Sequence, residues 1–211
     1  MKKSVFLNTL DFSYNEYLIV LKPNQDTCDK INSVKKDFSE KYKTSFFHST
    51  GQILMVKFIQ REMIEERLLN HLKNISNSYK PFLVKLKDYG SFPSHIIFIN
   101  IESQLQIRNL VTQLKSAQPL LTLDKENKAH FLDDFYISVA TKLLPWQYEK
   151  AWLEYNQAHF AASFIADAFT LQKRPVERKS NSFHPNGNYK TVKRFQFTDS
   201  PVITTQGELF G

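Results

Sequence analysis

The 211-residue chain has a single cysteine, Cys28, and only five glycines. One cysteine cannot form an internal disulfide or build a cysteine-based metal site. The sequence also lacks a glycine-rich phosphate loop and any His/Asp/Glu cluster with metal-ligand spacing. No apolar run approaches the roughly 20 residues of a membrane span, and Asn8 and Asp11 interrupt the N-terminal apolar stretch too early for a secretory signal. We therefore expect a cytoplasmic protein with no metal, no cofactor and no membrane partner.

The composition is that of an ordered globular protein. Hydrophobic residues make up 42% of the chain, and eighteen of the residues are phenylalanine. A chain of this length and composition can bury a sizeable core. Composition does not distinguish the fold classes, whereas the spacing of apolar residues along the chain does.

Positive charge is concentrated near the C-terminus. Residues 172–197 contain seven basic residues and one acidic residue, a local net charge of +6 in a chain whose net charge is +7. Such a segment attracts phosphates with strong salt dependence. The candidate contacts for RNA or a nucleotide phosphate are Lys173, Arg174, Lys190, Lys193 and Arg194. The alternative is a solvated surface with no ligand.

Hydrophobic periodicity predicts mixed helices and strands. Strands are expected at residues 17–21, 53–59, 82–87, 96–101, 136–144, 164–171 and 189–197. Helices are expected at residues 24–42, 62–76, from an N-cap at Ser103, and from Pro145 to about His159. Residues 175–188 contain Pro, Ser, Asn and Gly and are predicted to be a basic loop. The irregular order of elements indicates an α+β protein with antiparallel sheets.

The most informative stretch is residues 135–145, which read FYISVATKLLP. It resembles the second motif of the two-histidine phosphoesterases, the 2′-5′ RNA ligase-like family, which reads Pro-His-Leu-Thr-Ile-Ala-Arg or close to it. Tyr136 stands where that family has a catalytic histidine. Ser138 keeps the hydroxyl that the family has two residues later.

The family's first motif has a similar counterpart. That motif, Pro-His-x-Thr-Leu-x-x-Phe, resembles residues 51–58, GQILMVKF, with Gln52 and Leu54 at the histidine and threonine positions. Residues 89–99 resemble the family's central hairpin, and residues 143–148 and 169–174 continue the resemblance. It covers about residues 17–197 and depends on order and context, because both motifs are altered.

The family's chemistry explains why these replacements matter. Residues i and i+2 of a strand point the same way, so His-x-Thr places an imidazole beside a hydroxyl. Two such motifs supply one proton acceptor and one donor for 2′,3′-cyclic or 2′-5′-linked phosphodiesters, without a metal. Gln52 does not titrate, and a tyrosine pKa near about 10 makes Tyr136 a poor base at neutral pH. Of the four functional side chains only Ser138 remains, so we expect no catalytic residue.

The resemblance implies an α+β fold of two lobes, in which two antiparallel sheets flank a central cleft and helices lie outside. We expect one bilobal domain over residues 1–197 and a flexible tail over residues 198–211. The favoured function is a noncatalytic family member that binds RNA or a nucleotide phosphate in the cleft and on the basic segment. Gln52, Tyr136 and Ser138 are then hydrogen-bond donors; the alternative is that Gln52 and Tyr136 merely fill the cleft.

Two further hypotheses keep other functions open. The first is an active phosphodiesterase with relocated catalytic groups. His48 begins a His-Ser-Thr triplet four residues upstream of the expected register, His95 begins a strand beside the possible cleft, and His130 lies just before the second motif. The second is a protein-interaction module at the C-terminus. Gln206, Leu209 and Phe210 resemble the Gln-x-x-Leu-Phe peptides with which bacterial proteins dock on the DNA polymerase sliding clamp.

Overall fold

The computed structural model of the protein describes residues 13–44, 51–93, 95–179 and 182–198. The strands are β1 (Tyr14–Leu21), β2 (Ile53–Arg61), β3 (Phe82–Phe92), β4 (Ile96–Ile101), β5 (His130–Phe131), β6 (Tyr136–Thr141), β7 (Ala161–Ala166), β8 (Ala168–Lys179), β9 (Ser182–Pro185) and β10 (Lys190–Gln196). The helices are α1 (Gln25–Tyr42), α2 (Glu65–Asn77), α3 (Gln104–Leu114), α4 (Gln118–Leu121) and α5 (Pro145–Tyr155), with short 3₁₀ turns before α2 and α4.

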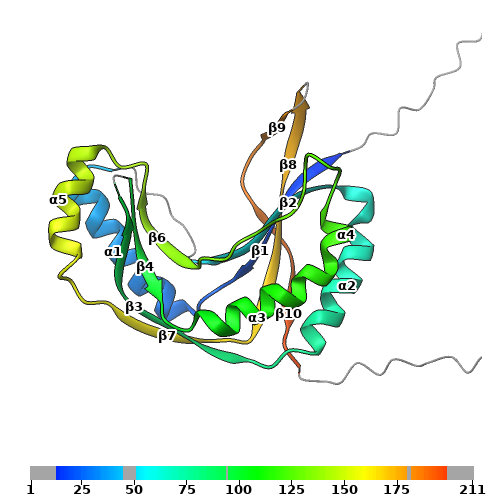
Figure 1. The fold of residues 1–211 in the computed structure, drawn as a ribbon, viewed down its shortest axis with the longest axis horizontal. Coiled ribbons are helices and arrows are strands. Elements are labelled where there is room, and N and C mark those ends of the chain that lie inside the picture. Colours follow the sequence, from blue (N-terminus) through cyan, green and yellow to red (C-terminus); the bar gives the residue numbers. More distant parts are fainter. Residues whose placement is uncertain (1–12, 45–50, 94, 180–181, 199–211) are drawn as a thin grey trace, which may run out of the picture.

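The described strands form two antiparallel sheets, which confirms the predicted α+β class. The six-stranded sheet has the order β10-β8-β1-β2-β5, and β9 pairs with the outer part of β8. The four-stranded sheet has the order β6-β4-β3-β7. In Figure 1 the two sheets form the two arms of a U, with α2 and α4 beyond one arm and α5 beyond the other.

Helices α2 and α3 cover one face of the six-stranded sheet. Apolar side chains alternate along β1, and Tyr17, Ile19 and Leu21 join the main core with Leu68 of α2 and Leu110 of α3. Alternation on a strand sends the intervening residues to the other face. We call that other face, which carries Glu16, Leu18 and Val20, the inner face of the six-stranded sheet.

Helix α1 covers one face of the four-stranded sheet. It begins after Asn24, whose side-chain oxygen accepts a hydrogen bond from Thr27 N at 3.3 Å. Its apolar positions at helical spacing, Phe38 and Tyr42, pack in a second core cluster with Ile97 of β4. We call the opposite face, which carries Tyr136, Ser138 and their neighbours, the inner face of the four-stranded sheet.

The structure corrects two predicted elements near the C-terminus. The single strand expected at residues 164–171 is in fact two strands, β7 and β8. Asp167 separates them, and they belong to different sheets. The basic loop expected at residues 175–188 is largely a hairpin, because β8 continues to Lys179 and pairs with β9. The hairpin projects beyond the rest of its sheet in Figure 1.

Smaller corrections concern element ends. β3 runs through to Phe92 across the segment expected to connect two strands, with a bulge between Leu86 and Tyr89. The Ser103 hydroxyl does not cap α3; it accepts a hydrogen bond from Lys85 N at 2.9 Å instead. Pro145 begins α5 as predicted, but the helix ends at Tyr155.

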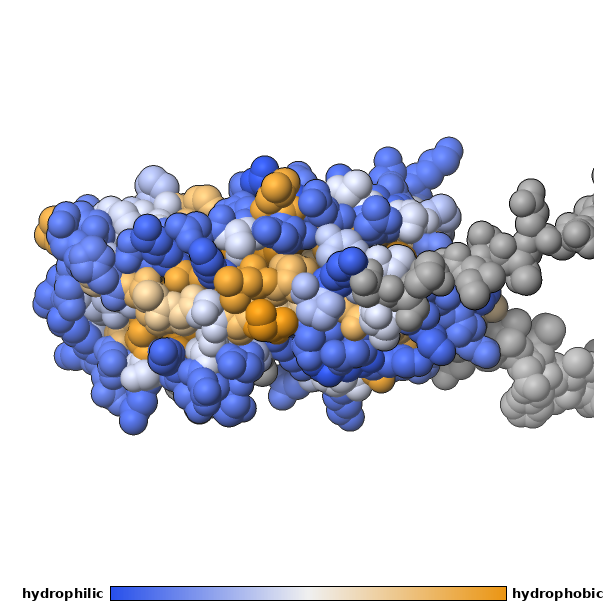
Figure 2. Space-filling view, turned by 90° about the horizontal axis from the view of Figure 1, so that it is seen from below, coloured by the Kyte–Doolittle hydropathy of each residue, from blue (hydrophilic) through white to orange (hydrophobic). Residues whose placement is uncertain are grey.

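The lower side of the molecule carries exposed apolar side chains. Leu83 and Ile165 are cross-strand partners of β3 and β7 and are 43% and 57% exposed. Figure 2, which views the molecule from below, shows apolar side chains gathered in the middle of that side within a hydrophilic surround. No helix in the described ranges is both long and apolar enough to cross a membrane.

Candidate functional site

The first motif lies on the inner face of the six-stranded sheet. Gln52 immediately precedes β2, and Leu54 lies two residues further, so both point to the same side. Leu54 pairs with Val20 of β1, which belongs to that face. The Gln52 amide donates to Gln172 Oε1 of β8, the strand on the other side of β1, at 3.2 Å. The residue predicted to stand at the family's first histidine position is therefore a neutral amide bonded to a second amide.

A charged cluster lies further along the same face. Glu16 is only 3% exposed, and its carboxylate lies 2.6 Å from Lys57 Nζ and accepts a hydrogen bond of 2.6 Å from Arg174 Nε. The Tyr189 hydroxyl donates to the same carboxylate, and the Arg174 guanidinium lies 4.4 Å from the Tyr189 ring centroid. The cluster of Glu16, Lys57, Arg174 and Tyr189 thus has a net charge of +1, and both of its cations are in contact with solvent.

The pKa of Glu16 follows from this arrangement. Burial raises it, but the hydrogen bonds from Lys57, Tyr189 and Arg174 outweigh burial, and the pKa lies below its ordinary value. The same contact acts in the opposite direction on the phenol: burial and the Glu16 carboxylate raise the pKa of Tyr189. At neutral pH the cluster therefore contains a carboxylate, two cations and a neutral phenol.

A histidine also lies on this face. His130 of β5 pairs with Lys57 of β2, so their side chains stand next to each other on the same side of the sheet. His130 is exposed. Of the two histidines that flank the motifs, His130 lies on the inner face, whereas His95 lies just before β4 with its carbonyl bonded to Leu143 N.

The second motif lies on the inner face of the four-stranded sheet. Tyr136 and Ser138 are half-buried in β6 and pair with Asn100 and Phe98 of β4. The Tyr136 ring packs 4.8 Å from Phe98 and 5.3 Å from Phe92, which in turn lie 5.0 Å apart. We call Phe92, Phe98 and Tyr136 the aromatic cluster. The residue predicted to stand at the family's second histidine position is therefore a ring packed against two other rings.

Gly90 makes room for the aromatic cluster. A Cβ at this position would lie 2.5 Å from the Phe98 ring and 2.6 Å from Asn100 Oδ1. Distances below 3.0 Å would force the ring or the strand to move. The glycine therefore lets the Phe98 ring lie directly on β3, next to Tyr136.

A short connection links the two motifs. Leu132 N, just after β5, donates to Met55 O of β2 at 2.9 Å, and the chain then enters the four-stranded sheet at Tyr136. Four residues span at most about 14 Å. The edge of β2 and the start of β6 therefore belong to one region, where the two arms of the U meet in Figure 1.

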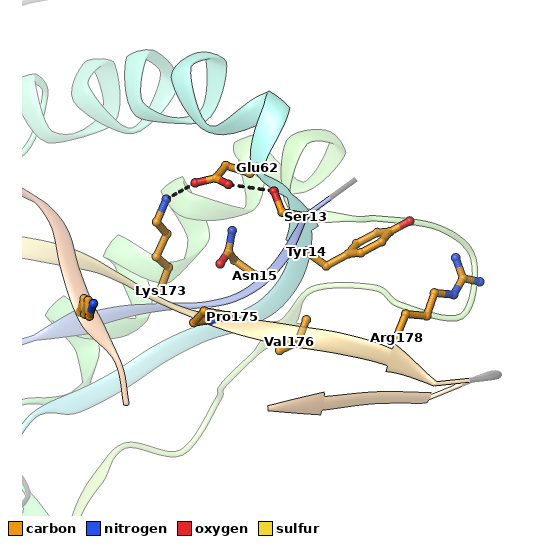
Figure 3. Close-up of a pocket in the computed structure, with 9 residues that line it drawn as sticks. Ser13, Tyr14, Asn15, Glu62, Lys173, Pro175, Val176 and Arg178 are labelled. Atoms are coloured by element: carbon orange, nitrogen blue, oxygen red, sulfur yellow. Dashed lines mark hydrogen bonds and ion pairs between the residues drawn. The ribbon is translucent and has the colours of Figure 1, made fainter. Parts of the chain in front are cut away.

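Most of the other predicted phosphate contacts lie elsewhere. Near the start of α2, Lys173 Nζ forms an ion pair with Glu62 at 2.8 Å (Figure 3) and another with Glu65 at 2.7 Å. Arg194 binds Asp167 at 2.6 Å. Lys193 lies over the Phe195 ring, and Lys190 lines a pocket beside Lys173. Only Arg174 of the five lies in the charged cluster.

The sequence interpretation missed several inner-face residues. Glu16, Lys57 and Tyr189 carry the charged cluster, and Phe92 and Phe98 complete the aromatic cluster. The available signal was the strand alternation, in which Glu16 and Lys57 interrupt apolar strands at positions that face away from the helices. His48, Gln206, Leu209 and Phe210 lie outside the described residues, so the hypotheses built on them stay predictions. Within the described ranges, no group of three His, Cys, Asp or Glu side chains is placed to hold a metal ion.

Comparisons with known proteins agree with this fold. The fold resembles TT0787 of Thermus thermophilus, with a TM-score of 0.58 and 12% identity over 87% of this chain and 98% of that chain. It also resembles E. coli LigT complexed with phosphate (TM-score 0.54) and LigT complexed with 3′-AMP (TM-score 0.52), each at 12% identity over 88% of this chain and 99% of LigT. No curated protein matches the sequence. The model of the 2′-5′ RNA ligase superfamily matches residues 42–178, most of the chain, and the protein therefore belongs to that superfamily.

Proposed function

We propose that this protein binds a nucleotide phosphate, free or at the end of an RNA strand, on the two inner faces, and that it does so without histidine-based catalysis. The observation that carries the proposal is the environment of the two motif positions. Gln52 is bonded to Gln172, and Tyr136 is packed against Phe92 and Phe98. Neither side chain is arranged for proton transfer.

The inner faces still offer the groups that hold a phosphate and a base. Lys57 and Arg174 supply positive charge beside the amides of Gln52 and Gln172, and Ser138 supplies a hydroxyl. Cations and amide donors suit phosphate oxygens. The aromatic cluster offers ring surface for a nucleobase, because base–aromatic stacking contributes about 1–3 kcal/mol per base. LigT, which has this fold, has been solved with phosphate and with 3′-AMP, which supports a nucleotide-sized ligand.

Catalysis by the family's route requires two titrating groups. A positioned general acid or base typically contributes a factor of about 10²–10⁴ each. Glutamine has no titrating group, and a tyrosine with a reference pKa near about 10 is protonated at neutral pH. The expected outcome is binding without turnover.

The test measures binding and turnover on the same purified protein. Isothermal titration with 3′-AMP and with a 2′,3′-cyclic nucleotide is expected to detect binding that weakens as salt rises. Arg174→Gln is expected to lower the affinity roughly tenfold, because it removes one charge-assisted phosphate contact. Arg67→Gln is the matched control, since Arg67 is exposed on α2 at the outer face. Equal affinities of the two variants would contradict the proposed site, and hydrolysis of the cyclic nucleotide would contradict its noncatalytic character.

One observation favours a second candidate, a phosphodiesterase with relocated groups. His130 stands beside Lys57 on the inner face, so an imidazole is present on the wall that lost its motif histidine. If turnover occurs, His130→Ala is expected to abolish it, whereas His159→Ala is not, because His159 is exposed and contacts Asp88 of β3. Turnover that survives His130→Ala would exclude this candidate.

A further inference from the structure

A second group of cations and rings lies along the β8–β9 hairpin and beside the start of β1. Tyr14 of β1 and Phe183 of β9 have ring centroids 5.2 Å apart. Arg61 lies over the Tyr14 ring at 6.0 Å, and Arg178 lies over the Phe183 ring at 5.7 Å. Arg61 is the cross-strand partner of Tyr14, and Arg178 is the partner of Phe183. We call these four residues the hairpin cluster.

A pocket of about 540 Å³ adjoins the hairpin cluster. Tyr14 and Arg178 line it together with Asn15, Glu62, Lys173 and Lys190 (Figure 3). Pockets of about 300–1,000 Å³ are typical of small-molecule sites. Lys173 forms an ion pair with Glu62. In the ranges that the structure describes, no ion pair within 4 Å involves Arg178 or Lys190. Lys190 is the cross-strand partner of Lys173, whereas Arg178 lies five residues further along β8. Arg178 is therefore the cation that the pocket offers to an anionic ligand beside the hairpin cluster.

We propose that the hairpin cluster and its pocket bind a further nucleotide of a single-stranded nucleic acid whose phosphate end lies on the inner faces. This inference rests on the proposed function and adds the kind of ligand, a strand rather than a mononucleotide. Tyr14 and Phe183 stack a base, and Arg178 holds its phosphate. Rings interleaved with cations are the arrangement with which proteins bind single strands irrespective of sequence.

The path between the two sites follows β8. Arg174 and Arg178 are four residues apart on this strand, and residues an even number apart point to the same side. At about 3.3 Å per residue they are about 13 Å apart. The Tyr189 and Phe183 rings lie under these two cations, at 4.4 Å and 5.7 Å. The inner face thus repeats the same pairing of arginine and aromatic ring along the strand.

A purely stabilising role accounts less well for the hairpin cluster than ligand binding does. Arginine stacked on an exposed ring contributes only about 0.5–1 kcal/mol to stability. The Asp124 carboxylate, whose low pKa owes most to Asn127 and only a minor part to Arg178, does not form an ion pair with that arginine. Arg178 is therefore held in place by a ring and left open to an anion.

The test uses the full chain and ligands of different length. Fluorescence anisotropy compares a labelled nucleoside 3′-phosphate with single-stranded RNA and DNA of about eight nucleotides, within the range of known single-strand sites. Wild-type affinity is expected to rise at least tenfold from the mononucleotide to the strand. Arg178→Gln and Phe183→Leu are each expected to lower strand affinity at least fivefold and to leave mononucleotide affinity unchanged. Arg178→Gln is also expected to lower the slope of log affinity against log salt by about 0.7.

Lys179→Gln is the matched control. It removes the same charge one residue away, from a lysine bound to Glu177 on the opposite side of β8. If Arg178→Gln and Lys179→Gln weaken strand binding equally, or if length does not raise affinity, the hairpin site is wrong even though mononucleotide binding remains. If the mononucleotide does not bind at all, the proposed function fails first. Circular dichroism of each variant checks that a loss of affinity comes from the changed site and not from unfolding.

Discussion

The Glu16 carboxylate gives the sharpest prediction, because its loss is expected to change stability and ligand affinity in opposite directions. Glu16 is 3% exposed and contacts Lys57, Arg174 and Tyr189. Removing one partner of a buried ion pair typically costs about 3–5 kcal/mol. Here Lys57 and Arg174 remain in contact with solvent, so we expect Glu16→Gln to lower the free energy of unfolding by about 2 kcal/mol. For a chain of this length that corresponds to a fall in Tm of about 4–8 °C.

The same change raises the net charge of the cluster by one. A phosphate about 5 Å from the lost carboxylate gains about 0.8 kcal/mol if the dielectric is that of water and about 3 kcal/mol at an effective dielectric of 20. We therefore expect Glu16→Gln to bind 3′-AMP at least about fourfold more tightly at low salt. A cluster with a purely structural role predicts weaker or unchanged binding. Thermal unfolding and isothermal titration on the same sample distinguish these results, and a variant that loses both stability and affinity would falsify the assignment of the phosphate to this face.

The pH dependence gives an independent check. The folded pKa of Glu16 is lowered, so its contribution to stability is present above its unfolded pKa, near about 4.3, and is lost as pH falls through the folded pKa. The difference in stability between wild type and Glu16→Gln is therefore expected to be constant from about pH 6 to 8 and to shrink below about pH 4. Urea unfolding at these pH values measures it. A difference that does not change in acid would mean that the carboxylate is not the stabilising group.

Three further predictions concern single side chains. Gly90→Ala is expected to cost about 1–3 kcal/mol, because its Cβ would lie 2.5 Å from the Phe98 ring and 2.6 Å from Asn100 Oδ1; unchanged thermal unfolding would contradict this close contact. Tyr136→Phe is expected to change stability by less than about 0.5 kcal/mol, whereas Tyr136→Ala is expected to cost about 2 kcal/mol, because the ring contributes through packing. Burial lowers the pKa of Lys35 to about 8, so the free energy of unfolding of the wild type is expected to rise between about pH 8 and 10.5. Lys35→Met is expected to be more stable than the wild type by about 2 kcal/mol at pH 7 and equally stable by about pH 10.5. Urea titrations at these pH values measure both effects.

The elements with one apolar face could be predicted from the sequence. β1 and β2 were found because apolar residues continue along them, and α1 was found because Ile31, Phe38 and Tyr42 repeat at helical spacing. The break at Asp167 was not predicted, because apolar residues continue on both sides of it while the chain changes from one sheet to the other. Local periodicity carries no information about which sheet a strand joins.

The β8–β9 hairpin was missed for a different reason. Its residues are exposed on both faces except the buried Val176 and the half-buried Phe183, so no alternation of apolar side chains marks it as a strand. The hairpin is built by main-chain pairing of β8 with β1 on one side and with β9 on the other. Pro175 fits because its carbonyl accepts from Asn186 N and it needs no donor there. Main-chain pairing of this kind leaves little trace in composition.

The motif positions could be located from the sequence, but their surroundings could not. The strand alternation placed Gln52 with Leu54 and Tyr136 with Ser138, and the structure agrees with each pair's position on one face of a strand. The partners of these residues come from distant segments: Gln172 lies 120 residues from Gln52, and the rings around Tyr136 come from β3 and β4. Such contacts depend on tertiary packing, which a single sequence does not reveal.

The surroundings of the two motif positions are the reason for proposing that their side chains bind a ligand and do not transfer protons. On one wall an amide is bonded to an amide, next to a carboxylate that two cations keep ionised. On the other wall the Tyr136 ring completes the aromatic cluster, and the absence of a side chain at Gly90 leaves room for that cluster. A proton relay needs a positioned acid and a positioned base, whereas these two positions carry an amide bonded to an amide and a ring packed against two rings. Fixed charge on one wall and ring surface on the other are complementary to the two halves of a nucleotide, its phosphate and its base.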